Sequence, residues 1–456
     1  MSQTQRWRTI CPKLHRVQEK ARANPEEQFT SLAHLLTVER LRRAYLRIEG
    51  NTAPGVDGVT KEDYGKELGK NLEELHRRLK ERKYRAKPVL RRRIEKPGGG
   101  ERLLGLPSTE DKIVQGAVVE ILNSIYEADF YGFSYGYRPG RGAHNALQAL
   151  QTVLQKGKVN WVVEADISRF FDTIDHKELM AVIRHRVIDP SLLRLIGKWL
   201  AAGVVEEDGR RIREKRGTPQ GGVISPLLAN IFLHEVVDKH VHEWRKRKVR
   251  GEIYIVRYAD DAVLAFEKES DARELLEELK KRLKEYGLEL NQEKTRVIRF
   301  GRKWGGPGSE TFDFLGFTHI AGKDRQGRYL VKRKTSRKRM NRSLKAIQQW
   351  CKKNRHTPIG WQHKELSRKL TGYYNYYGIR GNFDALSRVR SAVLMEWIHA
   401  LRKRSQRANV GRLFYLLKEI FVLPKPKITH SEGWFALIPG DLLRRAGCGN
   451  AARPDL

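Results

Sequence analysis

The sharpest chemical signal in the sequence is a pair of adjacent carboxylates, Asp260 and Asp261, which follow Tyr258 and Ala259. Two apolar runs, 253–258 and 262–266, flank the pair and predict two strands joined by a tight turn. Adjacent like charges repel, so the pair lowers stability unless a cation neutralises it. Mg²⁺ takes carboxylates, waters and substrate phosphates as ligands. The alternative is an acidic turn exposed to water, because aspartate is common in turns.

A third carboxylate, Asp166, lies near the end of another apolar run, 161–167. If that predicted strand neighbours the acidic hairpin, Asp166, Asp260 and Asp261 converge on one point. Three carboxylates can hold two divalent ions ~4 Å apart, an arrangement suited to in-line phosphoryl transfer. The alternative for Asp166 is a capping role at the end of a strand, and its position alone does not decide between the two.

Other patterns predict the elements that must hold these residues. A basic stretch, 87–106, turns at Pro97-Gly-Gly-Gly100 and reads as a hairpin. Asp175 with Glu178 predicts the start of one helix, and Ser225-Pro226, as a cap and first helical residue, predicts the start of another that continues over 227–244. Leucines at helical spacing predict a helix over 275–286, ended by Gly287.

The composition favours a nucleic-acid partner. The 456 residues include 90 Lys and Arg against 54 Asp and Glu, a net charge of +36. Such a chain attracts polyanions and gains affinity by releasing their counterions. An anionic membrane surface is the rival partner, but no run of ~18 apolar residues could span a bilayer. The polar N-terminus lacks a signal peptide, and the three cysteines are far apart, so we expect a cytoplasmic protein without membrane association.

We divide the chain into four regions. Residues 1–24 form a basic extension, and 25–325 mix helices with strands around the three aspartates. Residues 326–428 carry helical apolar stripes, and 429–456 form a weakly patterned tail. Between residues 323 and 355 there are fourteen basic residues and one acidic residue.

Taken together, several blocks resemble the group II intron-encoded reverse transcriptase and maturase family. The palm-like blocks, in family order, are Asp166-Ile-Ser-Arg-Phe-Phe-Asp-Thr-Ile-Asp-His176, Gly217-Thr-Pro-Gln-Gly-Gly-Val-Ile-Ser-Pro-Leu-Leu-Ala-Asn230, Tyr258-Ala-Asp-Asp261, Gly287-Leu-Glu-Leu-Asn-Gln-Glu-Lys-Thr295 and Phe314-Leu-Gly-Phe317. Two upstream blocks resemble the finger motifs: Ile94-Glu-Lys-Pro-Gly-Gly-Gly-Glu-Arg102 and Gly136-Tyr-Arg-Pro-Gly-Arg-Gly-Ala-His144. The resemblance implies an α+β right-hand polymerase fold, with fingers and palm followed by a helical thumb and maturase domain.

The resemblance also implies roles for single residues. Asp166, Asp260 and Asp261 would be catalytic and, with Ile167, would hold two Mg²⁺ ions, for which Mn²⁺ could substitute. Lys96 and Arg102 would neutralise the incoming triphosphate, unless they form only a solvated basic hairpin. Phe171 would pack under the deoxyribose and exclude a 2′-hydroxyl, whereas core packing is the alternative role. The other residues expected to border the nucleotide are Pro219, Gln220 and Gly221.

The region after residue 323 resembles the thumb and maturase domain, most closely at Leu366-Ser-Arg-Lys-Leu-Thr-Gly-Tyr-Tyr-Asn-Tyr-Tyr-Gly378. Helices with a basic face and interleaved aromatic residues suit a folded RNA or a template–primer duplex. The four residues expected to contact RNA are Arg337, Lys338, Arg342 and Lys345. The implied partners are structured intron RNA, an RNA template, a DNA primer or target, and deoxynucleoside triphosphates.

The sequence leaves rival functions open. The tail after residue 429 is too short and too poor in His and Cys for the metal-binding endonuclease of many family members, so we expect none. One rival is a group II-like reverse transcriptase serving a host task, such as defence, without an intron. Another is a non-catalytic RNA-binding splicing factor, which the three aspartates disfavour. An RNA-templated RNA polymerase is a third, disfavoured by Phe171. The oligomeric state is not indicated.

Overall fold

The computed structural model describes residues 12–95, 101–212, 216–218, 221–304, 309–404 and 409–430, without the side chains of Glu95, Arg102 and Val410. The described chain divides into two compact units, of which the first comprises 12–150 and 161–297 and the second 151–160 and 298–430. The functional division expected at residue 325 stays a prediction, because compact units need not coincide with functional domains.

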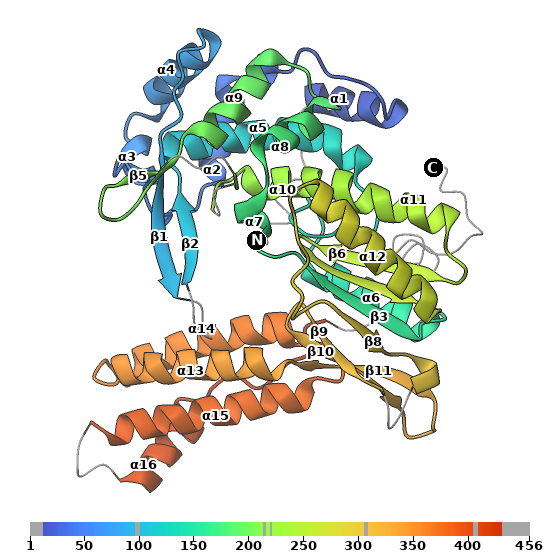
Figure 1. The fold of residues 1–456 in the computed structure, drawn as a ribbon. Coiled ribbons are helices and arrows are strands. Elements are labelled where there is room, and N and C mark those ends of the chain that lie inside the picture. Colours follow the sequence, from blue (N-terminus) through green and yellow to red (C-terminus); the bar gives the residue numbers. More distant parts are fainter. Residues whose placement is uncertain are drawn as a thin grey trace. The chain divides into compact units, whose positions relative to one another are not determined.

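The first unit contains most of the helices and the strands that carry the three aspartates (Figure 1). Its helices are α1 (Pro12–Ala23), η2 (Ala33–Leu35), α2 (Val38–Arg47), α3 (Lys61–Gly65), α4 (Leu68–Lys80), α5 (Thr109–Asp129), α6 (Ala143–Lys156, whose last residues belong to the second unit), α7 (Phe170–Thr173), α8 (His176–Arg184), α9 (Pro190–Ala201), α10 (Ser225–Leu233), η3 (His234–Asp238), α11 (Lys239–Arg247) and α12 (Glu269–Glu285). Its strands are β1 (Val89–Glu95), β2 (Glu101–Leu106), β3 (Trp161–Asp166), β4 (Val204–Val205), β5 (Arg211–Ile212), β6 (Ile253–Tyr258), β7 (Asp261–Phe266) and the start of β8 (Arg296–Arg299).

The central sheet has the strand order β6-β7-β3-β8. Strands β6 and β7 form the predicted antiparallel hairpin, and β7 also pairs antiparallel with β3. Apolar side chains fill both strands of the hairpin because helices cover the sheet, and leucines of α12, among them Leu275 and Leu279, pack into its core. The condition set by the sequence, that the strand of Asp166 neighbours the acidic hairpin, is therefore met.

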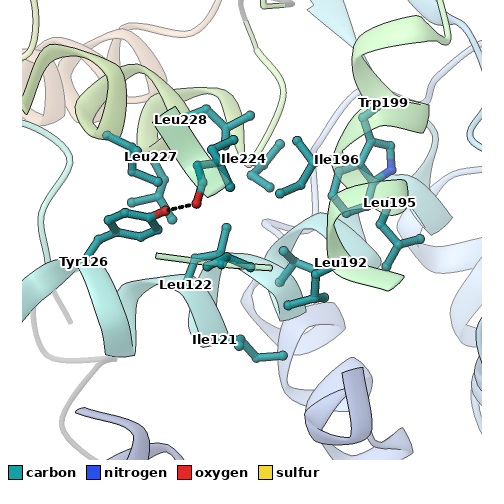
Figure 2. Packing of buried hydrophobic residues seen from close by; sticks show 14 of the residues in the cluster. Ile121, Leu122, Tyr126, Leu192, Leu195, Ile196, Trp199, Ile224, Leu227 and Leu228 are labelled. Atoms are coloured by element: carbon teal, nitrogen blue, oxygen red, sulfur yellow. Dashed lines mark hydrogen bonds between the residues drawn. The ribbon is translucent and has the colours of Figure 1, made fainter. Parts of the chain in front are cut away.

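A second sheet, in the order β2-β1-β4-β5, contains the predicted basic hairpin. Strands β1 and β2 are antiparallel, and β1 also pairs in parallel with β4. Beside this sheet, the core of the unit forms around α5, which is buried on nearly all sides. Figure 2 shows α5 residues Ile121, Leu122 and Tyr126 among apolar side chains of α9 and α10.

A long helical segment, α10 to α11, packs on the central sheet and is interrupted by the π-helical turn η3. The sequence predicted one uninterrupted helix here, with Ser225 as its cap. Instead, Ser225 is the first helical residue and Ile224 precedes it as the cap. A π-turn inserts one residue and so rotates the side chains that follow it. Asp238, the last residue of this π-turn, is buried and hydrogen-bonded to Arg257 of β6.

The second unit contains a three-stranded sheet, ordered β11-β10-β9, and a helical bundle. Its elements are β9 (Thr311–Phe314), β10 (Phe317–Lys323), β11 (Tyr329–Thr335), η4 (Arg302–Trp304), α13 (Arg337–Lys353), α14 (Ile359–Tyr377), α15 (Phe383–Arg402), α16 (Val410–Tyr415) and η5 (Leu416–Ile420). The apolar stripes predicted from the sequence pack together here, with Cys351, Leu366 and Trp397 in one core. In the described part of the chain, no helix combines the length and apolar character needed to cross a bilayer.

Candidate active site

The hairpin β6–β7 and strand β3 bring two aspartates side by side. Asp261 begins β7 and lies directly opposite Asp166, the last residue of β3, in the antiparallel register. Asp261 also pairs with Tyr258 across the hairpin. Ala259, at the turn, has a positive φ of 57°, a conformation that costs a non-glycine residue about 1–2 kcal/mol. The turn is therefore a strained connection that presents Asp260 and Asp261 at one end of the sheet.

At this end of the sheet, the negative charges of the three aspartates are only partly compensated by nearby positive charge. Loss of hydration raises the pKa of Asp261 to about 6, and the neighbouring charges of Asp260 and Asp166 contribute to that rise. The ammonium of Lys294 acts in the opposite direction but does not cancel them. A carboxyl group with a raised pKa, surrounded by like charges, is typical of sites that receive a cation or exchange protons.

Lys294 contacts Asp166, an interaction that was not predicted from the sequence. Its Nζ donates to Asp166 Oδ2 at 2.8 Å, and the ion pair raises the pKa of Lys294. The loop before it joins the end of β3, because Asn291 N donates to the Asp166 carbonyl. Lys294 lies in the block Gly287-Leu-Glu-Leu-Asn-Gln-Glu-Lys-Thr295, so the signal was present, but its role depends on a contact 128 residues away.

The carboxylates are not arranged as a finished metal site. Among the described residues, no three His, Cys, Asp or Glu side chains are grouped so as to hold an ion. Asp260 borders a cavity of about 30 Å³ beneath the turn, whereas Asp261 lies opposite Asp166. The hydrogen bonds that flank Ile167 use the Asp166 carbonyl and the Ser168 amide, and neither uses the Ile167 carbonyl. The assignment of metal ligands therefore stays a prediction.

Phe171 lies beside this end of the sheet, on the short helix α7. Its neighbour Phe170 is fully buried in the core, whereas Phe171 is only partly buried. The two rings meet edge to face at 5.5 Å. The Phe171 carbonyl accepts a hydrogen bond from Thr218 N, and Gly217 has a φ of 88° at a point where an added Cβ would lie 3.0 Å from the Asp172 carbonyl oxygen of α7. The Gly217 block is thus held against Phe171.

Gly221 joins this block to the basic hairpin. It has a φ of 115°, and a Cβ there would come within 2.3 Å of the Gly105 carbonyl on β2. Only glycine permits this close approach of two backbones. Lys96, Pro219 and Gln220, also expected at the nucleotide, lie outside the described residues, as does the side chain of Arg102. The backbone of Arg102 pairs with Ile94 in the hairpin.

A groove of about 790 Å³ opens near the turn within the first unit. Its walls come from the end of α2, from α5, from the loop 137–142 and from the start of α10, and Tyr258 lies at its edge. Its charged residues are Arg47, Glu49, Lys112, Arg138 and Arg141. The sequence did not predict this groove, because its walls are separated by up to about two hundred residues.

The four residues expected to contact RNA lie in the second unit, on helix α13. Arg337, Lys338, Arg342 and Lys345 are all exposed. Ile347 and Cys351 on the same helix are buried in the bundle core. The helix therefore has an apolar face and a basic face, as the sequence predicted, and RNA contact stays a prediction.

Comparison with known proteins identifies the lineage. Residues 94–319 match the family described as Reverse transcriptase (RNA-dependent DNA polymerase). The chain is 32% identical over 346 residues to Protein YkfC of Escherichia coli, covering 68% of this chain and 88% of that protein. It is 32% identical over 305 residues to the Group II intron-encoded protein LtrA of Lactococcus lactis subsp. cremoris, covering 63% of this chain and 50% of that protein.

One further relative is named as an intron maturase. Nuclear intron maturase 4, mitochondrial, of Arabidopsis thaliana is 29% identical over 150 residues, covering 33% of this chain and 18% of that protein. Among solved structures, an apo telomerase from Candida Tropicalis superposes with a TM-score of 0.40 at 16% identity, over 51% of this chain and 53% of that chain. The chain thus spans most of Protein YkfC but only half of LtrA. It belongs to the reverse transcriptase family, whose members act on nucleic acids with divalent metal ions, and within it to the group II intron-encoded proteins.

Proposed function

We propose that this protein is an RNA-directed DNA polymerase that extends a DNA primer with deoxynucleoside triphosphates at Asp166, Asp260 and Asp261. The observation that carries the proposal is the cross-strand pair of Asp166 and Asp261, whose mutual repulsion helps to raise the pKa of Asp261. The repulsion between these carboxylates lowers the stability of the free protein, and a bound cation would compensate for that loss. Membership of the reverse transcriptase family supports a cation at this position.

The donor set fits Mg²⁺. The candidate ligands are carboxylates with no thiol or imidazole among them, which is the chemistry that Mg²⁺ prefers, and Mn²⁺ accepts the same ligands. Two bound ions would lower the pKa of the primer 3′-hydroxyl and offset the charge of the triphosphate. The three aspartates would hold these ions, with the Ile167 carbonyl as a further ligand. Lys294 would stay close enough to compensate part of the acidic charge at Asp166.

Other residues would position the nucleotide. Phe171 would exclude a ribose 2′-hydroxyl, because its ring is fixed against Phe170 and α7 is fixed against the Gly217 block. Gly221 would let the nucleotide pass close to the backbone, with Pro219 and Gln220 beside it. Lys96 and Arg102 on the hairpin would neutralise the triphosphate, since cations there offset the charge that develops during transfer.

The groove beside Tyr258 would receive the template strand. Its volume of about 790 Å³ is large enough for a nucleotide, and it opens next to the acidic turn. Arg47 and Lys112 bring positive charge to its walls, and Tyr137, which is exposed, offers a ring for stacking.

A second role follows from the bundle. We propose that the exposed basic face of α13 binds structured intron RNA and assists splicing and intron mobility. The support is the exposure of four cations on one helix and the similarity to proteins named as intron-encoded or as an intron maturase. A host task such as defence is the alternative. The DNA flanking the reading frame discriminates between them, since only an intron protein is surrounded by the catalytic RNA domains of its intron.

The polymerase proposal is tested by Asp260→Asn in primer extension on poly(rA)/oligo(dT) with Mg²⁺. We expect most extension to be lost while RNA affinity stays close to that of the wild type, because the substitution removes a charge but little volume. Asp208→Asn, at an exposed turn, is the matched control and should extend normally. Undiminished extension by Asp260→Asn would reject the assignment.

A further inference from the structure

The strained turn at Ala259 needs an explanation beyond the hairpin itself. A positive φ at alanine costs free energy, and a two-residue turn without glycine could relax in several ways. Because Asp260 and Asp261 follow directly, any relaxation would move both carboxylates. Contacts beyond the backbone pairing of the hairpin are therefore needed to hold the turn.

Arg257, three residues before Asp260, makes contacts that reach this turn. Its guanidinium is only 2% exposed and donates to the Ala259 carbonyl at 2.9 Å. The same Nη1 donates to Asn230 Oδ1 at 3.0 Å, and Nε donates to Asp238 Oδ1 at 2.7 Å. A second bond from Nη2 to Asp238 Oδ2, at 2.5 Å, completes a two-point ion pair. Arg257 thus ties the turn to α10 through Asn230 and to the π-turn through Asp238.

The loop that begins with Gly136 supports the turn by direct backbone contact. A Cβ at Gly136 would lie 2.3 Å from Ala259 N, so only glycine fits. The Gly136 carbonyl accepts from Asn230 Nδ2 at 2.6 Å. Just before it, Tyr135 N donates to the Arg257 carbonyl, and Arg257 N donates to the Phe133 carbonyl. This block resembles a finger motif in sequence, but its first residue packs on the acidic turn.

Asp238, the last residue of the π-turn, is the buried partner of Arg257. Asp238 is 1% exposed, and burial alone would raise the pKa of its carboxyl group, but the charges and hydrogen bonds of Arg257 and His234 together outweigh burial, so that the pKa lies below the usual value. Replacing a buried ion pair by well-packed apolar residues is often neutral or stabilising. A buried pair is therefore weak evidence of a contribution to stability, and a role in fixing geometry accounts better for its bond to the Ala259 carbonyl.

We propose that Gly136, Asn230, Asp238 and Arg257 form a turn brace, a set of positioning residues that holds Ala259 in its strained conformation and so aims Asp260 and Asp261. The brace rests on the proposed function, because it matters for catalysis only if these aspartates hold the metal ions. It touches no substrate. Its loss should weaken metal binding and slow the chemical step while leaving nucleic-acid affinity unchanged.

The first test is Arg257→Lys, which keeps the positive charge beside Asp238 but cannot also reach the Ala259 carbonyl with the same geometry. Mn²⁺ binding is measured by electron paramagnetic resonance on the full chain with an RNA template, a 3′-deoxy-terminated primer and a deoxynucleoside triphosphate, so that no chemistry occurs. We expect several-fold weaker Mn²⁺ binding, and in a separate extension assay a rate lower by roughly 10- to 100-fold, the size of effect that small misplacements produce.

The matched control is Arg186→Lys. Arg186 is also a buried arginine in the same unit, paired with Asp129 and bonded to backbone carbonyls of residues 21 to 27. It has no contact with the turn among those bonds. We expect it to lower the melting temperature as much as Arg257→Lys does, but to leave Mn²⁺ binding unchanged.

The second test leaves the buried ion pair of Arg257 and Asp238 unchanged, so it can be used even if the Arg257→Lys protein does not fold. Gly136→Ala inserts one methyl group against Ala259 N and should displace the turn while the pair of Arg257 with Asp238 remains. Gly197→Ala, on α9 with no atom within 4 Å of the added Cβ, is its control. We expect weaker Mn²⁺ binding for Gly136→Ala alone, with unchanged duplex affinity.

Two results would overturn the brace. One is normal Mn²⁺ binding and a normal extension rate in a folded Arg257→Lys or Gly136→Ala protein. The other is an equal loss in each variant and its control, which would indicate general destabilisation. The Asp260→Asn variant distinguishes failure of the turn brace from failure of the proposed function. An active Asp260→Asn protein rejects both proposals, whereas an inactive Asp260→Asn protein together with a normal Gly136→Ala protein rejects the turn brace alone.

Discussion

Replacing Asp261 with asparagine should stabilise the metal-free protein at neutral pH even though it impairs activity. Loss of hydration, Asp260 and Asp166 raise the pKa of Asp261 from 3.8 to about 6, so the folded state disfavours the charged form. The difference of about 2 between these values corresponds to ~3 kcal/mol for a fully enclosed group. Many protein atoms surround Asp261, but its side chain is exposed to solvent. Solvent screening therefore reduces the expected difference in the free energy of unfolding to about 1 kcal/mol.

The stability difference between the wild type and Asp261→Asn depends on pH. Below pH 3.8 Asp261 is protonated in both states, and the charge has no cost. Between pH 3.8 and about 6 the unfolded chain loses the proton first, so the wild type loses stability relative to the variant, and above pH 6 the gap is constant. Melting temperatures in EDTA at pH 5 and pH 8 measure the gap, which we expect to reach about 2–4 °C at pH 8.

Added Mg²⁺ provides the internal control for this prediction. An ion that binds only the folded wild type stabilises it by mass action, so the gap should narrow or reverse with Mg²⁺. Asp208→Asn controls for the loss of an exposed carboxylate and should show no such pH dependence. A variant less stable than the wild type at pH 8 without metal, or a gap at pH 5 as large as at pH 8, would refute the electrostatic reasoning.

Two further predictions concern substrate choice and RNA. Phe171→Ala should raise ribonucleotide incorporation relative to deoxyribonucleotide in single-nucleotide extension; an unchanged ratio in a folded variant would assign Phe171 to the core alone. Replacing Arg337, Lys338, Arg342 and Lys345 together by glutamine should reduce the salt dependence of intron RNA affinity, by about 0.7–0.9 in log–log slope for each phosphate that is no longer neutralised. Competition between intron and scrambled RNA across salt concentrations measures this, and equal affinity of the wild type for both RNAs would contradict the maturase role.

Local patterns in the sequence predicted the elements and the candidate carboxylates. The β6–β7 hairpin follows from two apolar runs around an acidic turn, and the cap at Asp175 follows from its spacing to Glu178. These features depend on neighbours within a few residues, for which the chain itself is sufficient evidence. The bundle stripes of α13 to α15 were predictable for the same reason, since helical periodicity marks the buried face.

The contacts that complete the site were not predictable from local pattern. Lys294 meets Asp166 across 128 residues, and Asn230 meets Gly136 across 94. A buried arginine such as Arg257 contradicts the rule that charged residues lie outside, and only its partner Asp238 explains it. That partner lies in a π-turn, which no spacing rule in the sequence predicts. Contacts between residues far apart in the sequence and buried charged residues therefore could not be predicted from local pattern.

We propose that Asp166, Asp260 and Asp261 carry metal-dependent DNA synthesis on an RNA template. The most direct measurement is single-turnover incorporation of one deoxynucleotide on an RNA template, titrated with Mg²⁺, for the wild type and Asp166→Asn. We predict that the wild type requires Mg²⁺ and that Asp166→Asn is slower by roughly 100-fold or more at every Mg²⁺ concentration, with unchanged affinity for the template–primer. Incorporation by Asp166→Asn at the rate of the wild type, or incorporation by the wild type in EDTA, would contradict the claim.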